Sequence, residues 1–182
     1  MNLTPITPPT SEPVTLVEAR TQCRVDDSAS DGQLAGLILS AREWAQDFTG
    51  RTIVAQTWEL ALDAFPAVIE LPLAPVQSIT SITYTDTAGA TQTLDPTDYE
   101  ADLLSQPARI RASVAWPSTA DVYNAVRVRF VAGYAATHPD WHRFRTAILL
   151  HVEAHYDRDP AAMKALTEAA ESLLFPLRRW MS

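Results

Sequence analysis

The chain has 182 residues, of which 47% are hydrophobic and 20% are charged, so it is long enough to bury a core without stapling by disulfides or metals. Its 14 Lys and Arg residues against 22 Asp and Glu residues give a net charge of −8, which argues against sequence-specific binding of nucleic acid. The single cysteine, Cys23, excludes an internal disulfide and is interpreted as a small, semi-buried helix residue.

The N-terminal stretch MNLTPITPPTSEP holds four of the 13 prolines, so residues 1–13 are expected to form a flexible or extended arm. This stretch has neither the basic start nor the apolar centre of a signal peptide, and no run of about 18 apolar residues occurs in the chain. The simplest expectation is a protein made in a reducing cytoplasm, with no membrane partner.

Helical signals follow the arm. Thr15 and Glu18 have the spacing of a capping box that opens a short helix, and Ser30 with Gln33 repeats it. The next helix is predicted to end at Gly50, a residue suited to a left-handed C-terminal cap. Its apolar positions recur at helical spacing: Leu34, Leu37, Ile38, Ala41, Ala45 and Phe48, with Trp44 at the border of this stripe and interpreted as core.

The rhythm changes to period two from about Gln56 to Tyr134, which indicates β-strands. Strands are predicted around Trp58–Leu62, Ile69–Leu71, Thr80–Tyr84 (with Thr80, Ile82 and Tyr84 on one side), 91–94, 99–103, 109–114 and 126–132, with a hairpin loop at Asp86–Gly89. Arg127 and Arg129 alternate with apolar residues. They are interpreted as the solvated face of a half-buried strand rather than as a phosphate site.

Two further helices are predicted near the C-terminus. Pro139 suits the first turn of one, and Asp159 followed by Pro160 gives a cap and a first-turn proline for the other, which Pro176 should end near Phe175. The elements predict an α+β fold. A helical body of about four helices, 14–55 and 135–176, carries an inserted antiparallel β-module, 56–134, and a tail, 177–182.

Catalytic motifs are scarce. The sequence has no GxSxG, no Walker-type loop and no GxGxxG. His151 and His155 lie one helical turn apart and form the best metal-binding candidate, with Asp157 or His142 as a third ligand. Val152 stands where an HExxH protease has its glutamate, however, so polar packing between helices is the preferred interpretation. Asp26, Asp27 and Asp31 suit a helix N-terminus better than a calcium site. No metal, cofactor or enzymatic activity is expected.

Read in order, the pieces resemble a known family from about Val14 to Trp180. They are AREWAQDFTGR (41–51), TWEL (57–60), LPLAPVQSITSITYTDTAGATQTLDPTDYE (71–100), NAVRVRFVAGY (124–134), the helix after Pro139 and FPLRRW (175–180). Together these segments resemble the head-tail connector, or adaptor, proteins of long-tailed bacteriophages, prophages and gene transfer agents.

The resemblance implies a structural role in the virion neck. Subunits of this family form a ring of about a dozen copies beneath the portal and extend the DNA channel from capsid to tail, with helices in the ring body and the β-module projecting. The family's C-terminal segment engages the portal, which makes Phe175, Leu177, Arg178, Arg179 and Trp180 candidates for portal docking. A tail-side stopper or completion protein is an implied neighbour. DNA would pass without specific binding, and acidic side chains on the lumen wall would repel it.

The sequence also allows three functions other than that of an adaptor. The chain is a tail-side completion or stopper protein, a metal-dependent hydrolase that uses His151 and His155, or a DNA-binding packaging factor, against which the net charge of −8 argues.

Overall fold

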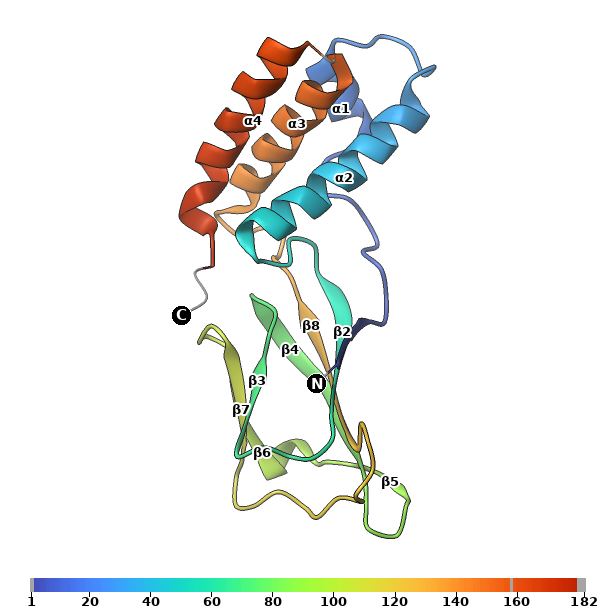
Figure 1. Ribbon diagram of the computed structural model, residues 1–182, viewed down its shortest axis with the longest axis vertical. Helices are drawn as coiled ribbons and strands as arrows, with labels where there is room; N and C mark the ends of the chain where they lie inside the picture. Colours follow the sequence, from blue (N-terminus) through green and yellow to red (C-terminus); the bar gives the residue numbers. More distant parts are fainter. Residues whose placement is uncertain (1, 158, 180–182) are drawn as a thin grey trace. The chain divides into compact units, whose positions relative to one another are not determined.

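The computed structural model describes residues 2–157 and 159–179, and these residues form an α+β fold, as predicted (Figure 1). The described helices are α1 (Leu16–Cys23), α2 (Asp31–Thr49), α3 (Trp141–Asp157) and α4 (Pro160–Leu174), with short 3-10 helices η1 (Pro96–Asp98) and η2 (Phe175–Leu177). The described strands are β1 (Asn2–Pro5), β2 (Gln56–Leu62), β3 (Val68–Leu71), β4 (Val76–Thr85), β5 (Thr91–Thr93), β6 (Tyr99–Asp102), β7 (Ala108–Ala112) and β8 (Val126–Ala132).

The chain divides into two compact units. Residues 55–133 together with the chain up to residue 9 form one, here called the β-unit. Residues 10–54 and the chain from 134 onward form the other, the helical unit. The β-unit therefore interrupts the helical unit in sequence, and each unit has a hydrophobic core of its own.

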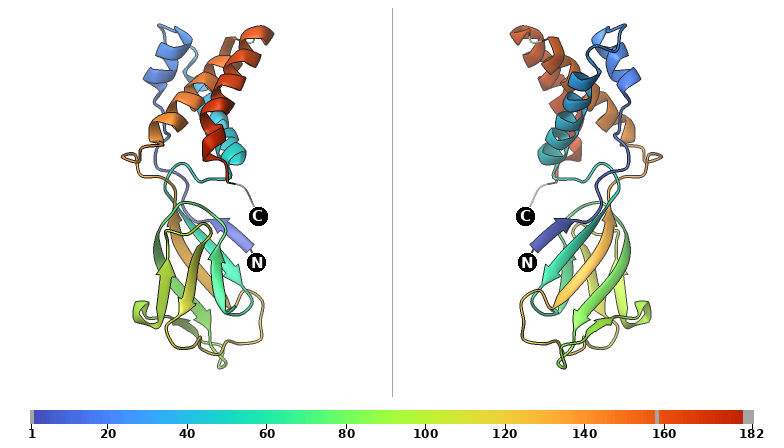
Figure 2. Two further views of the ribbon diagram at one scale, coloured as in Figure 1. Left: turned by 90° about the vertical axis from the view of Figure 1, so that its left-hand side faces the viewer. Right: turned by 90° about the vertical axis from the view of Figure 1, so that its right-hand side faces the viewer.

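The β-unit contains two antiparallel sheets in the described residues, one of five strands in the order β1-β2-β8-β4-β5 and one of three in the order β3-β7-β6. Both sheets can be followed in the two views of Figure 2. Their inner side chains form one core because alternate strand residues point to the same side. Its buried members are Leu60, Ile69, Leu71, Val76, Ile82, Leu94, Ala108, Ile110, Val126, Val128, Phe130 and Ala132.

Strand β4 departs from the predicted alternation. Its register against β8 shifts between Val76 and Ser78 and again between Ile79 and Ser81. Thr80 falls in the second shift and is exposed, whereas Ile82 is buried and Tyr84 packs against the core. The prediction that Thr80 shares a side with Ile82 and Tyr84 is therefore wrong, because an irregularity of this kind inserts a residue into the alternation.

The helical unit packs α2, α3 and α4 against one another, with α1 in contact with α2 and α3 (Figure 1). The predicted apolar stripe of α2 faces this core: Leu34, Ile38, Ala41 and Ala45 are buried, and Leu37, Trp44 and Phe48 pack against it. Phe144, Ile148 and Val152 of α3 are fully buried beside them. Cys23 is buried at the end of α1. Among the described residues, no helix is long and apolar enough to cross a membrane.

Local signals account for most helix ends. Thr15 and Glu18 form the predicted capping box, Gly50 caps α2 at φ 65°, and the Asp159 carboxylate accepts hydrogen bonds from the Ala161 and Ala162 amides at the start of α4. Ser30 occupies the N-cap position of α2 but makes no cap hydrogen bond, because its backbone (φ −92°, ψ 4°) is not in the extended conformation of a cap; its hydroxyl lies 3.0 Å from the Tyr156 hydroxyl instead. Helix α3 begins at Trp141, so Pro139 lies in the preceding turn rather than in the first helical turn.

The N-terminal segment contains ordered contacts. Residues 2–5 form β1, which pairs antiparallel with β2. Further along, the Glu12 carboxylate accepts a hydrogen bond of 2.7 Å from Nε of Arg42, whose side chain is only 6% exposed. Glu12 therefore supplies the nearer of two counter-charges for a buried guanidinium of α2, the other being Glu43 at 3.9 Å.

Candidate functional site

The predicted docking segment follows α4 directly. Helix α4 ends at Leu174, as Pro176 predicts, and the chain makes one 3-10 turn, η2, before it extends through Arg178 and Arg179. Pro176 has no amide hydrogen, so it cannot donate the backbone hydrogen bond that would continue the helix. The structure describes four of the five candidate residues: Phe175, Leu177, Arg178 and Arg179. Trp180 lies outside the described part of the chain.

The backbone of this segment is held against the C-terminal end of α2. The Arg179 amide donates to the Thr49 carbonyl at 2.8 Å, and Nε of Arg51 donates to the Leu177 carbonyl at 2.5 Å. The Thr49 carbonyl belongs to the last turn of α2, where helix carbonyls have no partner within the helix. The docking segment therefore completes the end of α2, and α2 in turn fixes the path of the segment.

The side chains of the segment divide by burial. Leu177 is 7% exposed and belongs to the core of the helical unit, whereas Phe175 is 54% exposed. The guanidinium carbon of Arg178 lies 5.0 Å from the ring centroid of Phe48, a cation–π distance. A shallow groove of about 340 Å³ lies beside them, lined by Phe48, Glu168, Glu171, Ser172, Phe175 and Arg178. The segment thus presents an aromatic and a cationic side chain from a backbone that is already fixed.

The two histidines of α3 form a stack rather than a chelating pair. The ring centroids of His151 and His155 are 4.1 Å apart, and Trp44 stacks on the other side of His151 at 4.2 Å. Nδ1 of His155 is 2.8 Å from the His151 carbonyl oxygen, so that nitrogen is engaged with the helix backbone. The interpretation from sequence is polar packing between helices; among the described residues the ring contact of His151 with another helix is its stacking on Trp44 of α2, and the polar contact of His155 stays within α3.

His151 is buried, and its environment disfavours a charge. Its Nδ1 has no hydrogen-bond partner among the described residues. Burial, and secondarily the neighbouring His155, lower the pKa of His151 to about 4. In the part of the chain that the structure describes, no group of three or more His, Cys, Asp or Glu residues is arranged to hold a metal ion. The Asp157 side chain, one of the suggested third ligands, lies outside that part.

The two arginines of β8 share one carboxylate. Glu59 on β2 accepts hydrogen bonds from Arg127 at 2.9 Å and from Arg129 at 2.7 Å, and its side chain is 10% exposed against 54% and 51% for the arginines. Burial acts to raise the pKa of Glu59, but the hydrogen bonds from Arg129 and Arg127 outweigh it and lower the pKa. The sequence places both arginines on an outer strand face but gives no sign that Glu59 lies between them.

Comparison with known proteins identifies the chain's relatives. A family model described as "Phage gp6-like head-tail connector protein" matches residues 13–104, just over half of the chain. No curated protein matches it.

Three solved structures share the fold over 100% of this chain and 97% of theirs. They are the neck of an empty GTA particle computed with C6 symmetry (22% identity, TM-score 0.79), the virion of a native gene transfer agent particle (21%, 0.75) and the neck of a native GTA particle computed with C12 symmetry (22%, 0.69). The extent of the family match, together with the resemblance read from segments 41–51 to 175–180, places this chain in the family of phage gp6-like head-tail connector proteins.

Proposed function

We propose that this head-tail connector subunit assembles with copies of itself into a ring in the neck of a virus-like particle, beneath the portal. The observation that carries the proposal is the family match over residues 13–104. The solved neck structures of the same fold, described with C6 and C12 symmetry, support a ring. The ring would extend the DNA channel from capsid to tail, and its subunits would be made in the bacterial cytoplasm before assembly.

The role we infer is structural and non-enzymatic. A connector needs faces that contact other proteins rather than a pocket that activates a substrate. The only catalytic hypothesis from sequence used His151 and His155, and the contacts of those rings support packing instead: one is pressed between Trp44 and His155, and the other bonds a helix carbonyl.

The contact with the portal is assigned to the segment from Phe175 to Trp180. Phe175 and Arg178 are its best-supported anchors because aromatic and arginine side chains dominate interface energies and because the backbone that carries them is fixed to α2. Leu177 contributes differently from the other candidates. Its side chain is buried in the helical core, so it secures the segment rather than contacting a partner.

The acidity of the chain suits a channel that DNA crosses without being held. With a net charge of −8, a ring of copies carries a large negative charge, and carboxylates on a lumen wall repel phosphates. The face of the ring opposite the portal would contact a stopper or completion protein on the tail side.

The test mixes the 182-residue chain with the portal ring of its own particle and examines the product by electron microscopy. We expect an additional ring-shaped layer on the portal, and Phe175→Asp should abolish it. Val17→Asp, which alters an apolar residue of α1 that is more exposed than Phe175, 67% against 54%, is the control and should leave binding intact. If the wild-type chain does not bind the portal, the proposal is wrong, and binding to the tail tube or stopper alone would support the tail-side alternative.

A further inference from the structure

The β-unit exposes two different sheet faces. The inner residues of both sheets build one core, so the remaining residues of each sheet lie on outer faces directed away from that core. One outer face belongs to the five-stranded sheet and the other to the three-stranded sheet, both visible in Figure 2. A single chain thus carries two unlike surfaces on opposite sides of one small unit.

The outer face of the five-stranded sheet is positively charged in a chain of net charge −8. Arg127 and Arg129 are about half exposed and share Glu59 as their only carboxylate among the described residues. The strands of this sheet contain no other charged residue, so the face has one uncompensated positive charge. The residues in register around the arginines are small or carry hydroxyl or amide groups: Asn2, Thr4, Thr57, Ala61, Ser81, Thr83 and Thr93.

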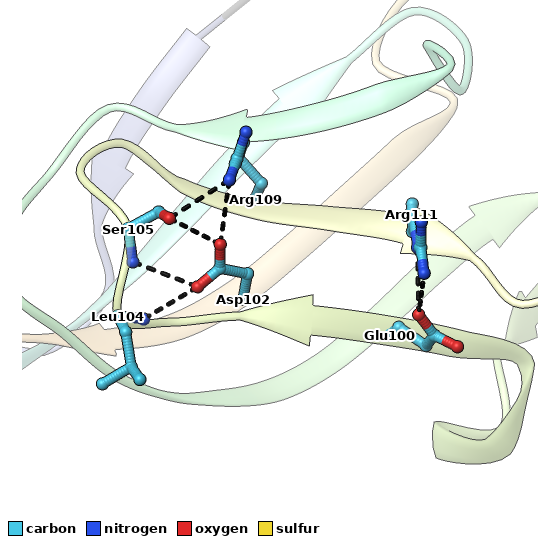
Figure 3. Close-up of polar contacts among 6 residues, drawn as sticks. All are labelled: Glu100, Asp102, Leu104, Ser105, Arg109 and Arg111. Carbon is cyan, nitrogen blue, oxygen red and sulfur yellow. Dashed lines mark hydrogen bonds and ion pairs between the residues drawn. The ribbon is translucent and has the colours of Figure 1, made fainter.

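The outer face of the three-stranded sheet has the opposite balance. Figure 3 shows two ion pairs that cross from β7 to β6 on this face: Arg111 donates to Glu100 at 2.9 and 2.6 Å, and Arg109 donates to Asp102 at 3.0 Å. Asp102 is held further by the Ser105 hydroxyl at 2.5 Å and by the Leu104 and Ser105 amides. These hydrogen bonds lower the pKa of Asp102 far below its usual value, with the Ser105 hydroxyl as the largest cause, so the carboxylate stays ionised.

Glu70 supplies the excess negative charge on this face. It lies opposite Arg109 in the β3–β7 register and is exposed, and its carboxylate has no ion pair or hydrogen bond with any described residue. A hollow of about 370 Å³ lies over the same sheet and is lined by Val68, Glu100, Asp102, Arg109 and Arg111 among others. Its size accommodates an arginine side chain from a partner.

We propose that these two faces are the two halves of a head-to-tail contact between neighbouring copies of this chain. The arginine face of one β-unit, Arg127 and Arg129, packs against the acidic face of the next, with Glu70 as the counter-charge. The inference rests on the proposed ring. A ring built by rotation needs two different, mutually complementary surfaces on each subunit, and opposite excess charges on opposite sides of one unit meet that requirement.

The chemistry of the two faces also suits reversible assembly. Both faces carry mainly charged or polar side chains, with Val68 as the exposed large apolar residue of the acidic face, so a subunit carrying them stays soluble before it meets the portal. Complementary charge guides the encounter and excludes pairing of two like faces, because arginine against arginine is repulsive. The contact is therefore directional, which favours closure into a ring over random association.

Cysteine cross-linking on the portal tests the geometry directly. In a Cys23→Ala background, we place cysteines at Val68, an exposed residue in register with Arg111 on the acidic face, and at Thr83, which is in register with Arg127, on the arginine face, so that Glu70 and both arginines stay in place. The double variant, assembled on the portal and treated with a short bis-maleimide, should give a ladder of covalent multimers, and each single variant should give none. Dimers from either single variant would indicate like faces in contact and would overturn the proposal.

Charge reversal provides the second measurement. Glu70→Lys and Arg127→Glu should each lower the assembled fraction at fixed concentration roughly tenfold, and their combination in one chain should restore it to within about threefold of wild type. Asp121→Lys, an exposed acid in the loop before β8, is the matched control. If only Arg127→Glu has an effect, through loss of DNA or heparin binding, the arginine face contacts nucleic acid and the inference is wrong.

The outcomes separate the two proposals. A wild-type ring that forms on the portal without any ladder from the double variant overturns the head-to-tail contact and leaves the ring standing. A wild-type chain that forms no ring overturns both.

Discussion

His151 is a buried titratable residue stacked between two aromatic rings. Its ring lies between those of Trp44 and His155, at 4.2 and 4.1 Å, and it is 9% exposed. A proton on this imidazole would be buried and would face a second imidazole, which is why its pKa is lowered to about 4. The helical unit therefore depends on a neutral His151.

Because the helical unit depends on a neutral His151, its free energy of unfolding should vary with pH in a defined way. The unfolded chain binds a proton at His151 near pH 6.5 and the folded chain only near pH 4, so the residue's contribution to stability is complete above about pH 6.5 and is lost as the pH falls toward 4. We expect the free energy of unfolding to fall by up to about 3 kcal/mol across this interval through His151 alone. Urea denaturation from pH 7.5 to 4 measures it.

The matched variants are His151→Phe and His142→Gln. The first keeps an aromatic ring between Trp44 and His155 but removes the titration, so the pH dependence should flatten relative to wild type. The second alters an exposed histidine of the same helix and should leave the profile unchanged. A wild-type profile that parallels the His151→Phe profile would contradict the buried, neutral histidine.

Helix ends are the element-scale feature that sequence predicts best. The Thr15–Glu18 box, the Gly50 cap and the Asp159 cap were all predictable because each depends on residues a few positions apart. Ser30 is the exception: its hydroxyl makes no cap hydrogen bond and contacts the hydroxyl of Tyr156, which is 126 residues away in the chain. Other features depend on residues far apart in the chain, so local sequence patterns do not predict them. They are the strand order, the irregularity at Thr80 and the position of Glu59 between two arginines of β8.

The candidate docking segment shows the same division. Pro176 correctly predicts the end of α4, and the aromatic and basic composition marks the segment as an interaction candidate. Its attachment to Thr49 and Arg51, and the burial of Leu177, depend on the end of α2 lying beside it, which no spacing in the sequence reveals.

Helix α2 offers one substitution with opposite effects at two positions. Gly50 has φ 65°, where an added Cβ is strained, although it would meet Arg179 only at an ordinary contact distance of 3.5 Å. Gly36 lies in the exposed helix interior with nothing within 4 Å of an added Cβ. Gly50→Ala should therefore lower the free energy of unfolding by about 1 kcal/mol or more, and Gly36→Ala should raise it by about 0.5–1 kcal/mol.

Chemical denaturation of the two variants beside wild type checks the signs. Both variants change glycine to alanine in or at the end of the same helix. Any general effect of alanine on the free energy of unfolding is therefore the same in both and cancels when they are compared. Gly50→Ala should also weaken portal binding, because the docking segment is attached to the turn that this glycine forms. Equal effects on stability at both positions would argue against the left-handed cap.

At the scale of the whole molecule, the chain consists of two units, one interrupting the other. Each unit has a separate buried core, and the helical unit is assembled from residues on both sides of the β-unit. The points where the chain leaves and re-enters the helical unit are adjacent: Val54 and Tyr134 form an isolated parallel bridge, and the Tyr134 amide donates to the Ile53 carbonyl at 2.8 Å. Because the two ends of the insertion lie side by side, the helical unit can keep the same structure with or without the inserted residues.

We therefore expect the helical unit to fold without the β-unit. A chain in which residues 10–54 are joined to residues 134–182 by a short Gly-Ser linker should show a helical circular dichroism spectrum and unfold cooperatively. Phe144→Ala in this shortened chain removes a fully buried ring and should cost about 3–5 kcal/mol, enough to abolish the cooperative transition. A non-cooperative parent that binds a hydrophobic dye would show that the helical core needs the β-unit. If the shortened chain folds and binds the portal but forms no ring, then portal docking belongs to the helical unit and the β-unit supplies a contact between neighbours that the ring needs.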